Sequence, residues 1–468
     1  MNMKSVTVDY GDRKLDIEVP EDAVVVEFEN PPLLEDPAAA VRAALANPYG
    51  CPPLSELAKP GMRVAIAFDD PTRPANSAQT ILPEIVDVLL GAGVSEADIL
   101  FINACSNHKK STRSEIAKHL GAKIFNRFWP KGQIINHDCS DPAQHMFLGV
   151  TQGGRYVEMN RHFVESDLMI YQGNVAPTAW KSYTGTGVVV GLGSTRSIAS
   201  HHSFHSIPDP GSKNAANTKR YGSVKAEVTA FLDNALGKQV FYINSVNGIG
   251  GKLAGVFAGA AEAVKPSAWE LAEKICRQPV PQADVLVIGL PASYAYGSSN
   301  NTLVAAIGAM VPPRLSSGKH VLREGGVIIA VSPTTGTIDE RVFPSYPEAI
   351  KLYRQCHTAR EMVDFEDEFC NRPDFLHAYT HNHAYPAIHA FWLFYENEYA
   401  LTRASRVIMA GTSNPGAFRD VGLTPTANFA DAWKIATRLV GPDPITVVAP
   451  TFYSKPKFKF DVQDSNEG

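Results

Sequence analysis

Short apolar runs that alternate with longer amphipathic segments are the feature that most constrains how this chain folds. Several runs are apolar without interruption, as in Val285-Leu286-Val287-Ile288. Unbroken apolar strands are typical of parallel sheets, because helices cover both faces of such a sheet. We therefore expect buried strands at eight places, residues 63–68, 99–103, 167–171, 240–245, 285–289, 326–331, 405–410 and 445–449.

Helical patterns lie between these runs. Residues 77–91 carry apolar side chains at helical spacing, and residues 111–120 begin with the Thr112 and Glu115 spacing of a capping box, with Gly121 expected to end the helix. Further helices are expected at residues 232–238, 251–264, 267–277, 301–310, 347–355 and 388–399. This alternation of strand and helix predicts an α/β fold with right-handed crossovers.

A domain boundary is expected near residues 278–282, where two prolines precede a new strand–helix series. We therefore expect two α/β domains with mainly parallel sheets, an N-terminal one over residues 1–278 and a C-terminal one over residues 279–468. Pockets commonly form between domains, so an active site is expected in the cleft between them. The tail after Pro456 has no core pattern and is expected to fray.

Composition and charge exclude several classes of protein. The 468 residues carry a formal net charge of −5 and no basic tract, which argues against nucleic acid or an anionic membrane as the main partner. No apolar run is long enough to span a membrane, and residues 1–21 lack the apolar core of a secretion signal. The six cysteines form no C-x-x-C pair, which fits a reducing compartment. We expect a cytoplasmic protein that acts on a small molecule.

Two polar turns follow expected strands and are candidates for chemistry. The first reads Asp70-Pro71-Thr72-Arg73-Pro74, and the second, residues 103–110, contains His108. Strands of open α/β sheets end at a crevice where ligands bind. Arg73 can bind a carboxylate or phosphate through two hydrogen bonds, and a histidine such as His108 can serve as a general base. A polar turn and a solvated surface histidine are the alternative interpretations.

A third segment, residues 173–187, is rich in small residues. Thr184, Gly185, Thr186 and Gly187 would let backbone N–H groups approach an anion such as phosphate. The segment matches neither the Walker pattern nor G-x-G-x-x-G, so neither ATP nor NAD is indicated. A flexible glycine turn is the alternative.

Histidines gather in two further segments. His201, His202 and His205 lie within five residues, and imidazole nitrogen is a ligand for zinc, copper, iron and nickel. No carboxylate stands at the spacing of a helical zinc site, and surface histidines are the alternative interpretation. Residues 377–389 hold four more histidines and two tyrosines, which face a cleft or pack as aromatic core.

Taken in this order, the motifs resemble those of the lactate racemase family. The family's D-x-T-R-P turn corresponds to residues 70–74, and its strand end with a histidine corresponds to residues 103–108. Its Gly-Asn-x-x-Pro stretch corresponds to residues 173–177, its glycine-rich loop to residues 182–187 and its Ile-x-x-x-His to residues 198–202. The resemblance covers most of the chain.

The resemblance implies an isomerase that inverts the C2 centre of a 2-hydroxy acid with a nickel-pincer nucleotide, which accepts a hydride from C2 and returns it to either face. His108 is then one of two acid–base residues that alternate at the substrate hydroxyl. His202 is the implied nickel ligand, with His201 or His205 as alternatives. The residues implied to line the cofactor and substrate site are Asp70, Thr72, Arg73, Thr178, Thr184, Gly185, Thr186 and Gly187.

Two positions depart from the family's pattern. The second catalytic histidine falls on Thr178, which cannot act as a base near neutral pH, and the lysine that anchors the cofactor covalently falls on Val188. We therefore expect a non-covalently bound nickel-pincer nucleotide. Lys181 is the catalytic candidate for the second face of the substrate, with His381 and His383 as further candidates.

The substrate pocket is also expected to differ, because residues 292–302 lack the glutamine and lysine usual in the family. The expected substrate is a 2-hydroxy acid other than lactate, such as a sugar acid or an aromatic hydroxy acid. Two alternatives stay open. One is one-way hydride or elimination chemistry on a hydroxy acid, and the other is a cofactor-free scaffold or binding protein of the same fold. A homo-oligomer is compatible with all of these functions.

Overall fold

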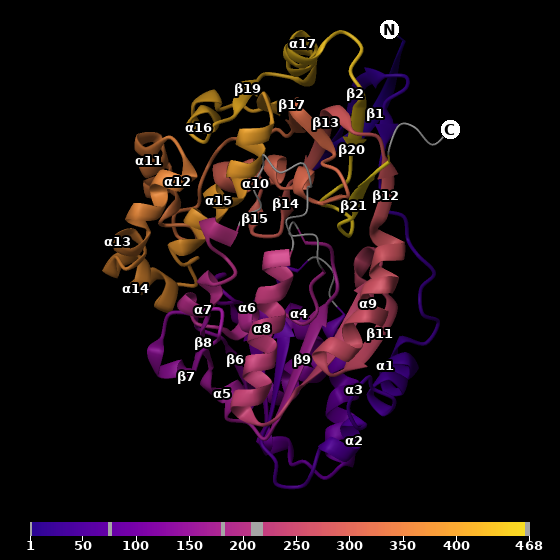
Figure 1. Cartoon of the computed structure of the whole chain (residues 1–468), viewed down its shortest axis with the longest axis vertical. Coiled ribbons are helices and arrows are strands. Elements are labelled where there is room, and N and C mark those ends of the chain that lie inside the picture. The colour runs from indigo at the N-terminus through magenta and orange to yellow at the C-terminus, as the bar shows by residue number, and fades with distance from the viewer. Residues whose placement is uncertain (1, 74–76, 179–182, 207–218, 464–468) are drawn as a thin grey trace.

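The computed structural model describes residues 2–73, 77–178, 183–206 and 219–463. Two α/β halves lie one above the other along the long axis (Figure 1). Each half contains a mainly parallel sheet with helices packed on it. The expected fold class, two α/β domains with mainly parallel sheets, is confirmed.

Six strands form the first sheet, namely β4 (Val64–Asp69), β5 (Ile99–Ala104), β6 (Ile134–Asn136), β9 (Leu168–Asn174), β10 (Val240–Asn247) and β11 (Leu253–Gly259). Their spatial order is β11-β10-β9-β4-β5-β6, and only β11 runs antiparallel to its neighbour. From β4 the chain adds β5 and β6 on one side and β9 and β10 on the other. The order therefore reverses between β4 and β9, and ligands in open α/β sheets bind at such a point.

Helices cover both faces of the first sheet, as its unbroken apolar strands require. Ile85 and Leu120 pack on one face and Leu232 and Val264 on the other, each at most 1% exposed. The covering helices are α1 (Pro37–Ala46), α3 (Ala78–Gly91) and α4 (Arg113–Phe128) on the first face, and α6 (Val188–Leu192), α8 (Lys219–Leu236) and α9 (Ala261–Cys276) on the second. The expected capping box of Thr112 begins α4.

Eight strands form the second sheet, namely β1 (Met3–Gly11), β2 (Arg13–Pro20), β3 (Val24–Val25), β13 (Ala283–Pro291), β17 (Leu322–Val331), β18 (Arg406–Ala410), β19 (Thr424–Thr426) and β20 (Thr446–Ala449). β13 is central, with β17 on one edge and β20 and β1 on the other. The helices on its two faces are α10 (Thr302–Met310) and α15 (Ile388–Arg403) on one and α17 (Phe429–Val440) on the other.

All eight expected apolar runs lie in strands of these two sheets. The first residues of the chain nevertheless differ from the expected division, which places them in the N-terminal domain of residues 1–278. β1, β2 and β3 complete the second sheet, and β1 joins β13 where Tyr10 pairs with Leu290. The division near residue 278 otherwise stays a prediction.

One expectation about local structure is wrong. The pattern predicts a helix over residues 251–264, but Leu253–Gly259 form β11. Gly250 and Gly251 have φ angles of 73° and 75°, which a right-handed helix does not accept, and they turn the chain back along β10. Gly121 ends the first helical stretch of α4 as expected, because its φ of 72° is not helical, and a second stretch follows the kink.

Residues 457–463 of the C-terminal tail are ordered instead of frayed, and the tail's last residues lie outside the described ranges. The ordered part forms β21 (Lys459–Val462), which lies between β12 (Arg277–Val280) and β16 (Ser316–Ser317). The Phe460 side chain is fully buried in the core of the second half. Residues 457–463 are therefore a fixed part of the fold.

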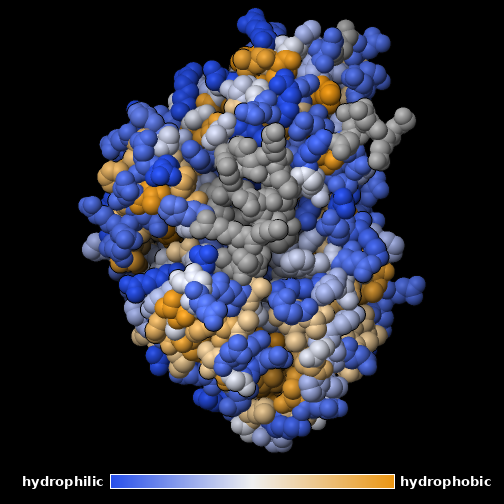
Figure 2. Space-filling view, viewed as in Figure 1, coloured by the Kyte–Doolittle hydropathy of each residue, from blue (hydrophilic) through white to orange (hydrophobic). Residues whose placement is uncertain are grey.

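Hydrophilic residues dominate the face of the molecule shown in Figure 2, with hydrophobic residues scattered among them over both halves. Among the helices that the structure describes, none is both long enough and apolar enough to cross a bilayer.

Candidate active site

A cavity of about 210 Å³ lies beyond the carboxyl ends of β4 and β9, at the point where the strand order of the first sheet reverses. The second half of the molecule closes it from the opposite side. Side chains of both halves line it, among them Asp69, Arg73, His108, Asn174 and His202 from the first and Tyr296, Trp392, Tyr453 and Lys457 from the second. The cavity thus occupies the cleft that the sequence predicts.

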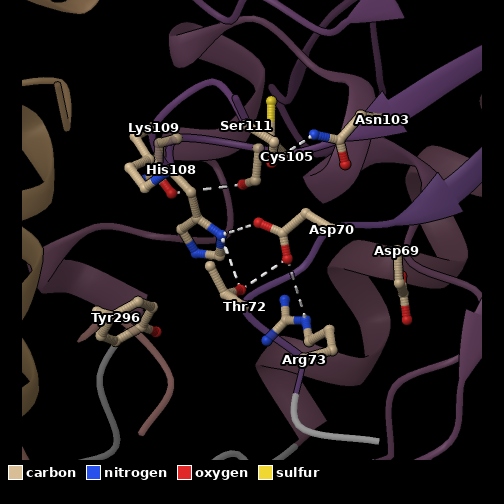
Figure 3. Close-up of polar contacts among 12 residues, drawn as sticks. Asp69, Asp70, Thr72, Arg73, Asn103, Cys105, His108, Lys109, Ser111 and Tyr296 are labelled. Carbon is tan, nitrogen blue, oxygen red and sulfur yellow. Dashed lines mark hydrogen bonds and ion pairs between the residues drawn. The ribbon is translucent and has the colours of Figure 1, made fainter. Parts of the chain in front are cut away.

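His108 and Asp70 form a buried hydrogen-bonded pair at one wall of this cavity (Figure 3). His108 Nδ1 lies 2.6 Å from Asp70 Oδ2, and the two residues are 6% and 2% exposed. Asp70 directly follows β4, and His108 lies in the turn after β5, so two neighbouring strands bring them together. Because a carboxylate only accepts hydrogen bonds, the Nδ1 proton points to Asp70. Nε2, which has no hydrogen-bond partner among the described residues, is left to exchange a proton with a ligand.

The pKa values of two adjacent carboxyl groups at this wall shift in opposite directions. Burial alone would raise the pKa of Asp70, but the charge and hydrogen bond of His108, together with Arg73, lower it to about 2. Burial raises the pKa of Asp69, although Arg73 and the Asn174 backbone N–H, which donates to Asp69 Oδ2 over 2.8 Å, oppose the shift. Asp70 is therefore the permanently ionised partner of His108.

Thr72 and Arg73 contact the other carboxylate oxygen of Asp70, and the Thr72 hydroxyl also lies 3.4 Å from His108 Nδ1. The Thr72 hydroxyl donates to Asp70 Oδ1 over 2.6 Å, and Arg73 Nε lies 4.0 Å from the same oxygen. The Arg73 side chain lines the cavity and stays 40% exposed. The D-x-T-R turn thus positions the carboxylate and also presents a cation to a ligand, while Asp70 and Thr72 support the site from behind its wall.

Aromatic rings from the second half surround His108. The ring centroid of His108 lies 5.3 Å from that of Tyr296, 5.7 Å from that of His389 and 6.3 Å from that of Tyr385. Burial lowers the pKa of His389 well below its usual value, and its Nδ1 is hydrogen-bonded to the Tyr346 hydroxyl at 2.7 Å. Burial raises the pKa of Tyr296 to about 12. These neutral rings keep water away from His108, which strengthens electrostatic interactions there.

The histidine segment after the glycine-rich loop contributes two rings to the cavity. His201 and His202 stack with centroids 4.6 Å apart, and His202 packs against Trp392 at 4.4 Å. His205 is exposed and is not among the described cavity residues. Within the described ranges, no group of three or more His, Cys, Asp or Glu side chains suits a metal ion.

The glycine-rich loop borders the cavity in part. Thr184 lines it, but its hydroxyl is used by the loop itself, since it accepts from the Ala176 N–H at 2.9 Å. Gly185 has φ of 113°, and an added Cβ would lie 3.0 Å from Asn244 Oδ1. Gly187 also lines the cavity, and a Cβ there would meet no atom of the described residues within 4 Å. Among the described residues, the loop therefore leaves space beside Gly187 where a ligand can approach the backbone.

Other predicted residues are placed as follows. Thr178 lines the cavity, whereas Thr186 is buried and is not among the described lining residues. Val188, at the position of the family's covalent lysine, is buried in the core of the first half. Lys181, the catalytic candidate for the second face, lies outside the described residues. Gly185 lines the cavity.

The candidates His381 and His383 do not reach the cavity. Both are exposed, and His383 Nδ1 is 3.0 Å from the Lys110 carbonyl oxygen on the outer surface. The helical turns after His383 direct His389 toward His108 instead. The segment therefore meets the site through its last histidine, because Tyr385 and His389 are buried whereas the earlier histidines are solvated.

Sequence reasoning missed the residues that the second half contributes. Tyr296 and Trp392 carry no motif, and their approach to the site depends on how the two halves pack. A signal did exist for Lys457, because Lys457-Phe458-Lys459-Phe460 alternates polar and apolar residues as a half-buried strand does.

Comparisons with known proteins agree with this geometry. The family model of the lactate racemase N-terminal domain matches residues 10–215. The chain is 23% identical over 342 residues to a lactate racemase of Thermoanaerobacterium thermosaccharolyticum, covering 70% of this chain and 74% of that protein. It is 26% identical over 294 residues to a lactate racemase of Lactiplantibacillus plantarum, covering 62% of this chain and 65%, just under two thirds, of that protein.

Solved structures show the same fold along the whole chain. The lactate racemase apoprotein of T. thermosaccharolyticum superposes with a TM-score of 0.72 at 20% identity, covering 98% of this chain and 100% of that one. A Thermotoga maritima protein gives a TM-score of 0.53 at 16% identity, covering 88% and 96%. Residues 10–215 match the lactate racemase N-terminal domain, the sequence matches and the shared fold support membership of the lactate racemase-like superfamily, and the lactate racemase homologues indicate an isomerase.

Proposed function

We propose that this protein is a racemase or epimerase that inverts the C2 centre of a 2-hydroxy acid with a non-covalently bound nickel-pincer nucleotide. The observation that carries the proposal is the His108–Asp70 pair, 2.6 Å apart, at the wall of a cavity between the two halves. An imidazole held by a permanently ionised carboxylate is suited to accept and return the proton of a substrate hydroxyl. The relatives' shared activity supports the same reaction class.

The residues around the cavity are compatible with such a cofactor. His202 would be the protein ligand of the nickel, and the open space beside Gly187 would admit the nucleotide to the backbone. Arg73 and Thr178 would border it. With valine at position 188, binding would rest on these non-covalent contacts. When bound, the cofactor supplies a hydride acceptor for C2.

The chain's own groups would carry the proton chemistry. His108 Nε2 would remove the hydroxyl proton as C2 is oxidised and return it as C2 is reduced. Asp70 would stabilise the imidazolium and keep its ring in place, as a carboxylate does in hydrolytic triads. Tyr296, Tyr385 and His389 would exclude water, so that the oxidised substrate is retained.

The cavity wall also indicates the substrate's side chain. Several apolar and aromatic residues line the part contributed by the second half, namely Tyr294, Ile307, Val311, Leu315 and Tyr453. A sugar acid would leave hydroxyl groups without partners against such a wall, which is unfavourable. We therefore favour a 2-hydroxy acid with an aromatic or large apolar side chain over lactate or a sugar acid.

Nickel content tests the proposal. The full-length protein is co-expressed with a nickel-pincer biosynthetic system and purified, beside His202→Ala and the matched control His205→Ala, which changes an exposed histidine of the same segment. We expect near-stoichiometric nickel in the wild type and in the control, and its loss in His202→Ala. A folded wild type without nickel would favour a cofactor-free scaffold. The presence of Thr178 and Val188 in place of the family's histidine and lysine also favours that alternative. Nickel without inversion of any hydroxy acid would favour one-way chemistry.

A further inference from the structure

Lys457 presents an ammonium group to the cavity without a partner. It lines the cavity, and within the described ranges it has no hydrogen bond and no ion pair. Its neighbours in sequence are different, because Lys455 pairs with Glu27 at 3.1 Å and Lys459 pairs with Glu273 at 3.3 Å. Of three lysines in one short segment, only Lys457 is left for a ligand.

The tail holds this lysine in place. Phe458, the next residue, is 1% exposed and packs against Phe452 with ring centroids 5.0 Å apart. Phe460 packs against the same ring at 5.9 Å, and its backbone N–H donates to the Leu315 carbonyl over 2.8 Å. Because Phe458 and Phe460 are both packed in the core, the backbone at Lys457 needs little further ordering when a ligand binds.

The charges around Lys457 favour an anion. Burial and the nearby Arg73 guanidinium lower the pKa of Lys457 to about 8, with Glu396 opposing the shift. The Glu396 carboxylate forms a buried ion pair with Arg314, which shares its charge. Arg73 and Lys457 therefore both face the cavity. Asp70 and Asp69 offset the charge of Arg73 in part, whereas Lys457 has no ion pair within the described ranges. A bound anion would therefore relieve the repulsion between the two cations in this desolvated space.

We propose that Lys457 and Arg73 together bind the carboxylate of the substrate, which fixes the 2-hydroxy acid with its C2 centre in reach of His108. The proposal rests on the proposed function for the identity of the anion. A phosphate group of a nucleotide has the same charge chemistry, and the experiment separates the two sources. Lys457 acts by binding and orientation and exchanges no proton with C2.

The test is calorimetric binding to the purified full-length protein, with racemic 3-phenyllactate as the carboxylate probe, 3-phenyllactamide as its uncharged analogue and inorganic phosphate as the alternative anion. Lys457→Met is compared with Lys455→Met, a matched change two residues away, and with Lys457→Arg, which keeps the charge. Loss of one charge-assisted hydrogen bond should weaken phenyllactate binding about 10- to 100-fold in Lys457→Met. Lys455→Met and Lys457→Arg should bind within a few-fold of wild type.

Phenyllactamide should bind weakly and equally to wild type and Lys457→Met, and phosphate should not displace phenyllactate. Equal phenyllactate affinity of wild type and Lys457→Met would overturn the proposal, as would absence of phenyllactate binding to the wild type. A Lys457-dependent site that prefers phosphate would overturn the assignment to a carboxylate. Lys457-dependent binding of phenyllactate without any racemisation would leave this subsite standing and reject only the proposed function.

Discussion

The Asp70 carboxylate should stabilise the folded protein in a way that depends on pH. Its pKa falls from 3.8 to about 2 because His108 and Arg73 outweigh the effect of burial. At 1.36 kcal/mol per unit, this shift corresponds to about 2 kcal/mol of stability at neutral pH. Since the folded pKa is the lower one, this stability is present above pH 3.8 and is lost as the pH falls toward 2.

Asp70→Asn should therefore lower the free energy of unfolding by about 2 kcal/mol at pH 7. The gap between variant and wild type should narrow below pH 4, because the Asp70 carboxyl of the unfolded wild type then binds a proton that the folded protein does not bind, which lowers wild-type stability. Urea unfolding followed by circular dichroism at pH 7, 5 and 3 measures both quantities.

Asp69→Asn is the matched control. Burial raises the pKa of Asp69, so its negative charge does not stabilise the fold, and removal of this charge should cost less than removal of the charge on Asp70. Equal losses in the two variants, or an Asp70→Asn gap that is undiminished at pH 3, would refute the reasoning.

Three further predictions concern the loop, the lysine and the tail. Gly187→Ala should fold normally, since its Cβ meets no described residue within 4 Å, but should lose nickel loading. Gly185→Ala should lower the melting temperature because φ is 113° there, and nickel analysis and thermal unfolding check the two variants. Carboxylate binding should weaken as the pH rises through about 8, where Lys457 loses its proton, and Lys457→Arg should keep its affinity to higher pH; calorimetry from pH 6 to 10 measures this. Phe460→Ala should cost about 3–5 kcal/mol of stability and also weaken carboxylate binding, because the tail no longer holds Lys457.

A specific result would contradict each of these three predictions. Full nickel loading of Gly187→Ala would show that the ligand does not use the space beside this glycine. A binding curve that is flat through pH 8 would argue against a neutral form of Lys457. Unchanged carboxylate affinity in a destabilised Phe460→Ala variant would show that Phe460 is not needed to hold Lys457 in position for binding.

The strands could be predicted from the sequence because both sheets are buried on two faces. Such strands are unbroken apolar runs, as in β13, and turns with glycine or proline bound them. β11 escaped prediction because Leu253–Gly259 is short and has the apolar spacing of a helix, and only its pairing with β10 decides its structure. That β1 belongs to the second sheet could not be predicted either, because this placement depends on pairing between residues that are far apart in the sequence.

The residues of the candidate site also fall into those that could be predicted from the sequence and those that could not. Asp70 and His108 could be predicted, because each follows its strand directly and strand order alone brings them together. Tyr296 and Trp392 could not, because they approach only when the second half packs over the first. The alternation at residues 457–460 indicates a strand, but it does not indicate that Lys457 reaches the site. Lys181 and Thr178 were inferred by resemblance alone, and a role for either stays a prediction.

The most direct test of the central claim is the enantiomeric composition of a 2-hydroxy acid incubated with protein that was co-expressed with the nickel-pincer biosynthetic system. Enantiopure 3-phenyllactate and lactate are followed by chiral chromatography, with wild type beside His108→Ala. We predict that the wild type brings phenyllactate to an equal mixture of enantiomers faster than lactate, and that His108→Ala binds nickel yet leaves both unchanged. Inversion at the wild-type rate by His108→Ala, or no inversion by nickel-loaded wild type, would contradict the account.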